Sequence, residues 1–193
     1  MKLGIVIGSI RVGRVSDRVA KWVAKEAQNL SGTEVQIIDL IDYPMPIFNE
    51  SAPPQANPDR EVDMSVRRFL DVISPLDALV LVTPEYNRSY SSVLKNAIDY
   101  LDFQLYKKPV QLVAHGSTGG AQAVSHLRAV LPGLGAITNP IAVMLTERAG
   151  NIINEDGELN EELKSSPDGP QNTLKNALND LKWYSDALAT ARQ

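Results

Sequence analysis

The start of the chain constrains the fold more than any other part, because a short apolar run passes through a small loop into a helical pattern. Residues 3–7 are apolar and predict a short strand that is buried on both faces. The run ends at Gly8, and apolar residues at helical spacing predict a helix that begins just after Ser16. The loop between these two elements contains two glycines, two serines and two arginines.

This loop has the composition of an anion-binding site. The N-terminus of a helix leaves backbone N–H groups unpaired and carries about +0.5 of a charge. Arginine adds fork-shaped donors that match phosphate oxygens. The alternative is an ordinary turn with two solvated arginines, but the density of glycine, serine and arginine favours a phosphate. We therefore predict a phosphate site formed by Ser9, Arg11, Arg14 and Ser16.

Strand-like and helix-like patterns alternate along the rest of the chain, which is typical of a parallel sheet with helices on both faces. We predict one domain over residues 1–193, an α/β fold with a doubly wound five-stranded parallel sheet in the order 2-1-3-4-5. Gly32 is expected to end the first helix. The later strands are expected within residues 35–40, 78–82, 110–114 and 135–145, the last interrupted near Pro140, and the helices around residues 19–30, 62–73, 93–101, a stretch ending near 131, and 174–188.

Two segments are expected to lie outside this alternation. Residues 43–54 are rich in proline, which lacks an N–H and fixes φ, so they are expected to form an irregular loop that borders the ligand site. Residues 146–170 are polar, contain an Asp156-Gly157 turn signal, and are expected to form an excursion rather than a second domain. Helical spacing also places Trp22, Trp183 and Tyr184 in the predicted core.

Three of the predicted strands end in loops that carry chemically useful residues. In a sheet of order 2-1-3-4-5, the loops after the first, third and fourth strands surround the crevice where the strand order reverses. The loop after the third strand offers backbone donors and an aromatic wall. The glycines of the loop after the fourth strand permit close approach of a planar ligand. We therefore predict one site formed by the first loop together with residues from the other two. The loop after the third strand contributes Pro84, Glu85, Tyr86 and Asn87, and the loop after the fourth strand contributes Ser117, Gly119 and Gly120.

The first loop excludes two common nucleotide sites. It lacks the G-x-G start of the dinucleotide fingerprint. It half-matches a nucleotide P-loop, but Arg14 and Val15 stand where lysine and the magnesium-binding hydroxyl are required, and no carboxylate ends the third strand. A phosphate monoester bound without a metal, with a planar ring at the other end of the crevice, describes FMN in a flavodoxin-like fold.

Three stretches of the chain resemble the NADPH-dependent FMN reductase family, which includes quinone, chromate and azo-dye reductases. They are residues 8–14 (Gly-Ser-Ile-Arg-Val-Gly-Arg), residues 83–89 (Thr-Pro-Glu-Tyr-Asn-Arg-Ser) and residues 94–100 (Leu-Lys-Asn-Ala-Ile-Asp-Tyr), and the likeness extends over residues 3 to about 135. The resemblance implies that the first loop holds the FMN phosphate. It also implies that the loop after the third strand lines the isoalloxazine and that the loop after the fourth strand meets its pyrimidine edge. The chain departs from the family at Ser91-Ser92, where Pro-Gly is common, at Arg14, and at Ser16, a position often taken by asparagine.

Composition excludes several other classes of protein. The net charge of −4 and the lack of a basic run indicate no positively charged surface for binding nucleic acid. The absence of cysteine excludes disulfides, thiolate metal sites and cysteine nucleophiles, and we predict no metal site. No apolar run is long enough to cross a membrane, and Met1 leads directly into the first strand, so a cytoplasmic protein is expected.

These observations predict an enzyme that passes hydride from NADPH, or NADH, through FMN to a quinone, free flavin or similar small acceptor by a ping-pong mechanism. The chemistry would take place on the flavin, so no catalytic side chain is assigned. The alternatives are a flavodoxin-type electron carrier and an FMN-binding regulatory protein, but the loop arginines and the modest charge favour an enzyme.

Three side-chain expectations complete the prediction. The apolar helix over residues 94–101, together with Tyr100, Phe103 and Tyr106, predicts a homodimer or homotetramer. Glu85 is expected to pair with Arg88 or Lys95, and His115 to make a structural hydrogen bond rather than act as an acid.

Overall fold

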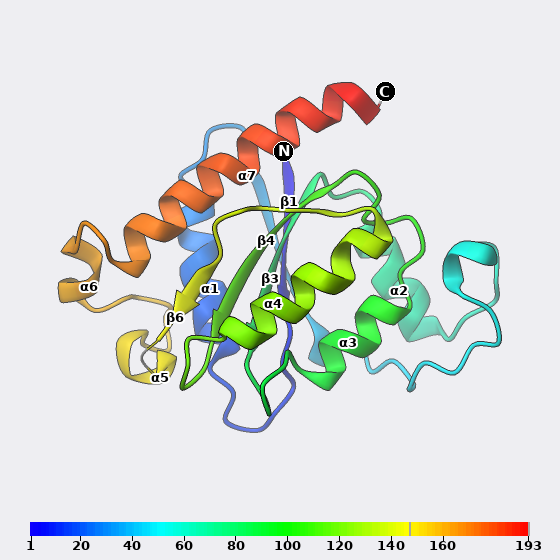
Figure 1. The fold of residues 1–193 in the computed structure, drawn as a ribbon, viewed down its shortest axis with the longest axis horizontal. Helices are drawn as coiled ribbons and strands as arrows, with labels where there is room; N and C mark the ends of the chain where they lie inside the picture. Colours follow the sequence, from blue (N-terminus) through cyan, green and yellow to red (C-terminus); the bar gives the residue numbers. More distant parts are fainter. Residues whose placement is uncertain (147, 193) are drawn as a thin grey trace.

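The computed structural model describes residues 1–146 and 148–192, and it is built on one parallel sheet (Figure 1). The strand order is β2-β1-β3-β4-β5, and β6 also pairs with β4. The predicted flavodoxin-like order is therefore confirmed. The strands are β1 (Lys2–Ile7), β2 (Glu34–Asp39), β3 (Ala78–Pro84), β4 (Pro109–His115), β5 (Ile137–Thr138) and β6 (Val143–Leu145).

Helices cover both faces of the sheet. Figure 1 shows α1 and α7 against one face and α2, α3 and α4 against the other. Within the described residues, no helix is long and apolar enough to cross a bilayer. The helices are α1 (Ser16–Ala27), α2 (Met64–Ile73), α3 (Ser92–Asp99), α4 (Ala121–Val130), α5 (Ala149–Ile152), α6 (Glu161–Ser165) and α7 (Pro170–Arg192), with short 3₁₀ turns at Leu40–Asp42, Pro54–Ala56 and Leu131–Leu134.

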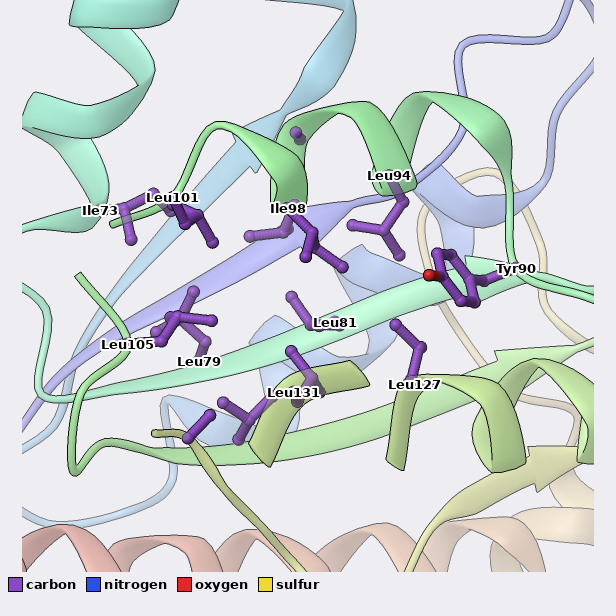
Figure 2. Close-up of a cluster of buried hydrophobic side chains, with 14 of the residues drawn as sticks. Ile73, Leu79, Leu81, Tyr90, Leu94, Ile98, Leu101, Leu105, Leu127 and Leu131 are labelled. Atoms are coloured by element: carbon purple, nitrogen blue, oxygen red, sulfur yellow. The ribbon is translucent and has the colours of Figure 1, made fainter. Parts of the chain in front are cut away.

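The central strands contribute side chains to two separate cores. Because side chains alternate along a strand, Leu79 and Leu81 pack toward α2, α3 and α4, whereas Val80 and Val82 pack toward α1 and α7. Figure 2 shows Leu81 below Ile98 of α3, with Leu127 approaching from α4. Burial on both faces explains why these strands read as unbroken apolar runs in the sequence.

The last edge of the sheet is interrupted, as predicted. β5 pairs with the start of β4 and β6 with its end, and Pro140 lies between them. Proline has no N–H to donate to the ladder. The buried side chain of Gln111 spans the break by donating to Ile141 O at 2.9 Å, and Asn139 Nδ2 donates to Ala177 O of α7 at 2.9 Å.

Several boundaries differ from the prediction because local hydrogen bonds decide them. α1 ends at Ala27, so Gly32, with φ of +68°, forms the turn into β2 instead of ending the helix. α2 begins at Met64 because the Asp63 carboxylate accepts from Ser65 N at 2.8 Å, which leaves Val62 outside the helix. β3 continues through Pro84, which lies opposite His115 in the ladder.

The segment 146–170 packs more closely than its polar composition predicts. Ile152, Ile153 and Leu159 are buried in the core beneath α1 and α7. Gly157 forms the predicted turn with φ of +79°, and a Cβ there would lie 2.5 Å from Lys21 Cβ. The excursion is therefore pressed against α1.

The prediction that Trp183 lies in the core is wrong, because its side chain is 66% exposed on α7. Tyr184 and Leu188 are only half-buried, whereas Trp22 is buried. The buried residues of α7 are Leu174, Ala177, Leu178, Leu181 and Ser185, so Trp183 lies on the face of the helix that turns away from the sheet.

Polar contacts attach the proline-rich segment, residues 43–60, to α3 and to the residues that follow it. Asn96 donates to Pro46 O and accepts from Phe48 N, both at 2.8 Å. The Arg60 guanidinium is buried, with ion pairs to Glu50 at 2.6 Å and Asp102 at 3.3 Å. The irregular segment is thus fixed by specific side chains.

We expect Arg60→Ala to lower the free energy of unfolding by about 3–5 kcal/mol, because it leaves Glu50 and Asp102 without their buried counter-ion. The control is Lys182→Ala, which removes the more exposed ion pair with Asp186 and should cost about 0.2–1 kcal/mol. Urea denaturation measures both changes. Equal losses for the two variants would contradict the structural importance of the buried network.

Candidate functional site

The chain leaves β1 at Gly8, where close packing against β3 requires glycine. Gly8 N donates to Val82 O at 2.8 Å, and a Cβ at Gly8 would lie 2.9 Å from that oxygen. The Ser91 hydroxyl donates to Gly8 O and accepts from Leu94 N at 3.2 Å, so it also caps α3. The first loop therefore begins at a point fixed by two neighbouring elements.

The side chains of the first loop are already engaged with other elements. Ser9 is buried, and its hydroxyl lies 2.9 Å from Tyr86 OH. Arg14 forms an ion pair with Asp39 at the end of β2 and donates to Ser9 O at 2.5 Å. Arg11 instead lies over the Tyr86 ring, with its guanidinium carbon 5.1 Å from the centroid, and it is exposed.

The N-terminus of α1 has no side-chain cap. Its N-cap residue is Val15, which cannot accept a hydrogen bond through its side chain. The N–H groups of the first turn therefore lack an intrahelical acceptor and are available to an anion. Ser16, the first residue of the helix, is completely buried, and its Oγ lies 2.9 Å from His115 Nε2.

A tight turn projects from the end of β3. Tyr86 and Ser89 exchange backbone hydrogen bonds of 2.8 and 3.0 Å, and the two residues between them have positive φ, +48° at Asn87 and +67° at Arg88. Both central residues of a type I′ turn require this conformation, which asparagine adopts readily and arginine rarely. The strained turn positions Tyr86 beside the first loop.

Glu85 joins the ends of β3 and β4. Its carboxylate accepts from the Thr118 hydroxyl at 2.8 Å and from the N–H groups of Gln122 and Ala123 at 2.9 and 3.4 Å. Partial burial by itself raises the pKa of Glu85, but these hydrogen bonds outweigh it and lower the pKa below its ordinary value. The predicted pairing with Arg88 or Lys95 is wrong, because the uncapped start of α4 offers nearer donors.

Two glycines shape the loop before α4. Gly119 and Gly120 have φ of +72° and +81°, and a Cβ at Gly120 would lie 2.5 Å from Ala114 Cβ. Gly120 is also the N-cap of α4 and has no side chain to cap it. Glu85 supplies the missing acceptor from the neighbouring strand.

These loops enclose a cavity of about 390 Å³ at the switch point of the sheet. Five predicted site residues line it: Arg11, Pro84, Glu85, Tyr86 and Ser117. No residue of the segment 43–54 is among its lining residues, so the expectation that this segment borders the site is wrong within this cavity. The other predicted site residues are not among its lining residues; they are Ser9, Arg14, Ser16, Asn87, Gly119 and Gly120.

One wall of the cavity was not anticipated. Residues 148–151, which include Arg148 and Asn151, follow β6 and line the cavity beside the first loop. Gly150 packs closely there, since a Cβ would lie 3.1 Å from Val15 Cγ1. The signal that could have found this wall is its position after the fifth predicted strand, at the same edge of the sheet.

His115 makes the structural hydrogen bond that was predicted, and its ring also lines the cavity. Burial, together with the nearby Arg11 charge, lowers the pKa of His115 to about 4. The imidazole is therefore neutral at pH 7. Among the described residues, no group of three or more His, Asp or Glu side chains is arranged to hold a metal ion.

We expect the neutral His115 to weaken the fold as the pH falls. The unfolded chain binds this proton near pH 6.5 and the folded chain only near pH 4, so the unfolded state binds more protons between these values. The free energy of unfolding should decrease from pH 6.5 to pH 4 by up to about 3 kcal/mol from this group. His115→Asn should lack this component in urea denaturation, and parallel pH profiles for the two proteins would contradict it.

The fold is that of a flavodoxin-like α/β protein, with a cavity at the carboxyl ends of its strands. The model of the NADPH-dependent FMN reductase family matches residues 1–150. An NAD(P)H-dependent FMN reductase of Saccharomyces cerevisiae is 34% identical over 143 residues, which cover 69% of this chain and 75% of that protein. An FMN-dependent NADPH-azoreductase of Staphylococcus haemolyticus is 32% identical over 147 residues, covering 74% and 76% of the two chains.

A solved structure shows the same fold. The flavoenzyme NAD(P)H:(acceptor) oxidoreductase of Paracoccus denitrificans has a TM-score of 0.70 at 24% identity and covers 98% of this chain and 97% of its own. The chain belongs to the NADPH-dependent FMN reductase family. It is thus an oxidoreductase that works with FMN and a reduced nicotinamide nucleotide.

Proposed function

We propose that the cavity at the switch point binds FMN and that the whole chain acts as one FMN-binding domain. The observation that carries this proposal is that the uncapped N-terminus of α1 lies beside Arg11, which is exposed and has no carboxylate partner among the described residues. Arg11 and the first-turn amides of α1 would hold the phosphate. At the other end, Gly116 and Ser117 line the cavity together with Tyr86, and a planar ring would lie beside them.

The remaining predicted residues would support this arrangement in different ways. Ser9 and Arg14 hold the first loop in place through Tyr86 and Asp39. Glu85 fixes the loop that contains Ser117, Gly119 and Gly120, and Asn87 forms the turn that presents Tyr86. Direct contact of the Ser9, Arg14 or Ser16 side chains with the phosphate stays a prediction.

We further propose that the protein oxidises NADPH, or NADH, and reduces a quinone, free flavin or similar small acceptor. Bound FMN supplies the hydride- and electron-transfer chemistry, which explains why no catalytic side chain is required. The sequence has no second nucleotide fingerprint, so donor and acceptor would occupy the same cavity in turn. The role of the protein is to orient both partners and to exclude other reactions.

We expect Arg11→Ala to weaken FMN binding by about 1.5–3 kcal/mol, the scale of a charge-assisted hydrogen bond, and to leave riboflavin binding unchanged. The control is Arg192→Ala, because Arg192 pairs with Asp77 just before β3, at the opposite edge of the sheet. Fluorescence titration with the two flavins measures these affinities. Unchanged FMN affinity, or wild-type protein that binds riboflavin as tightly as FMN, would refute the phosphate assignment.

If donor and acceptor share one cavity, initial rates measured while NADPH and a quinone are both varied should give parallel double-reciprocal lines, the pattern of a ping-pong mechanism. The same assay separates an enzyme from an electron carrier or a regulatory flavoprotein, which would show no turnover with a small acceptor. Intersecting lines would mean a ternary complex and a second binding surface.

We also propose that the protein is a homodimer or homotetramer. Tyr100 and the apolar residues of α3 are buried within the chain, so the proposal now depends on Phe103 and Tyr106, which are 51% and 52% exposed. Two half-exposed aromatic residues three positions apart in the chain favour a protein interface.

We expect light scattering to give the mass of a dimer or tetramer for the wild type and a smaller mass for the double variant Phe103→Ser, Tyr106→Ser. Trp183→Ser is the matched control, because Trp183 is an exposed aromatic residue on α7. A wild-type monomer at every concentration would contradict the proposal.

A further inference from the structure

His115 connects the buried start of α1 with the proposed cofactor cavity. Its ring is at the end of β4, 7% of the residue is exposed, and it is one of the residues that line the cavity. On its inner side, Nε2 lies 2.9 Å from the hydroxyl of Ser16, which is 0% exposed. The ring therefore has one nitrogen in the protein interior and one that remains for another partner.

The burial of Ser16 decides which ring nitrogen carries the proton. In the part of the chain that the structure describes, His115 Nε2 is the hydrogen-bond partner of the Ser16 hydroxyl. If Nε2 carried the proton, the Ser16 O–H would be buried without an acceptor, at a cost of about 1–3 kcal/mol. The Ser16 O–H therefore donates to Nε2, and a neutral imidazole that accepts at Nε2 carries its proton on Nδ1.

Nδ1 is the ring nitrogen that remains for a ligand. Among the described residues it has no hydrogen-bond partner, and it is not one of the fully buried polar atoms that lack a partner. Since His115 lines the cavity and its Nε2 is engaged by Ser16, Nδ1 is the donor that the residue can offer to a ligand there. A neutral N–H donor thus stands in the cavity together with Arg11 and beside the first turn of α1.

We propose that His115 is a ligand-binding residue whose Nδ1–H donates to an oxygen of the ribityl phosphate chain of the bound flavin nucleotide, and that Ser16 is a positioning residue that fixes the tautomer and orientation of the ring. This inference rests on the proposed FMN site. It selects the ribityl phosphate chain rather than the isoalloxazine because Ser16 and Arg11 belong to the phosphate end of the cavity.

The tautomer can be measured without any substitution or ligand. The chain has two histidines, and the other, His126, hydrogen-bonds Ser89 on the surface and serves as an internal reference. At pH 7, ¹⁵N NMR of the ring nitrogens should show His115 protonated at Nδ1 and unprotonated at Nε2. Protonation at Nε2 would overturn the inference.

The contact to the ligand is tested by affinity. His115→Leu should weaken FMN binding about tenfold, the loss of one hydrogen bond to a charged or strongly polar acceptor. His115→Asn should retain affinity within about threefold, because its amide can place an N–H donor near the position of Nδ1. Rescue by asparagine is not expected from a side chain that only fills space.

Ser16→Ala separates positioning from contact. It should weaken FMN binding by a smaller factor than His115→Leu, and the double variant should bind no more weakly than His115→Leu alone, because both changes remove the same interaction. Urea denaturation of each variant shows that binding is measured on folded protein. Additive losses would overturn the positioning role of Ser16.

Three flavins locate the acceptor oxygen. Lumiflavin lacks the ribityl phosphate chain, so His115→Leu should not change its affinity. Riboflavin has the ribityl hydroxyls but no phosphate. If the acceptor is a ribityl hydroxyl, His115→Leu should lower riboflavin affinity, and if the acceptor is the phosphate, riboflavin affinity should stay the same. Equal losses for lumiflavin and FMN, or no loss for FMN, would overturn this inference and leave the proposed function intact. Wild-type protein that does not bind FMN would instead overturn the proposed function and this inference with it.

Discussion

The close approach of Gly8 to Val82 is the contact on which the arrangement of the site depends. Because residue 8 has no Cβ, the backbone of β1 can donate to β3 at the last position of the sheet before the first loop begins. Ser91 then ties the same residue to the start of α3. A side chain at residue 8 would separate these elements and displace the loop from the two neighbouring strand ends.

From that fixed point, side-chain hydrogen bonds connect all the loops at the C-terminal edge of the sheet. Tyr86 reaches Ser9, His115 reaches Ser16, and Arg14 reaches Asp39, so the loops after β1, β2, β3 and β4 are joined directly. Such contacts fix a binding site before a ligand arrives, which reduces the entropy lost on binding. The scaffold therefore supplies a preformed cavity rather than a set of mobile loops.

The same contacts divide the charged residues between structural and binding roles. Asp39 engages Arg14, and Thr118 with the start of α4 engages Glu85, so these charges stabilise the fold. Among the described residues Arg11 has no carboxylate partner, and it lies over the Tyr86 ring. In the proposed FMN site, positive charge for a dianion would come from Arg11, from the N-terminus of α1 and from Arg148, which lines the same cavity.

The sequence by itself determined the parallel sheet and the three loops that meet at one of its edges. The alternation of strand-like and helix-like patterns is a local property of the chain and predicts a doubly wound fold, whose order 2-1-3-4-5 brings these loops together. The sequence also marked Gly119 and Gly120 as positions of close approach to a ligand, whereas in the structure they pack against Thr146 and Ala114.

The tertiary structure alone decided which side chain meets which. The partners of Glu85, Arg14 and Ser16 lie far away along the chain, or belong to the start of a helix whose position depends on packing. The wall formed by residues 148–151 and the exposure of Trp183 depend likewise on how distant elements cover one another. Local pattern gives the face and the edge on which a residue lies, but pairing between distant residues is set by the packing of the whole sheet and its helices.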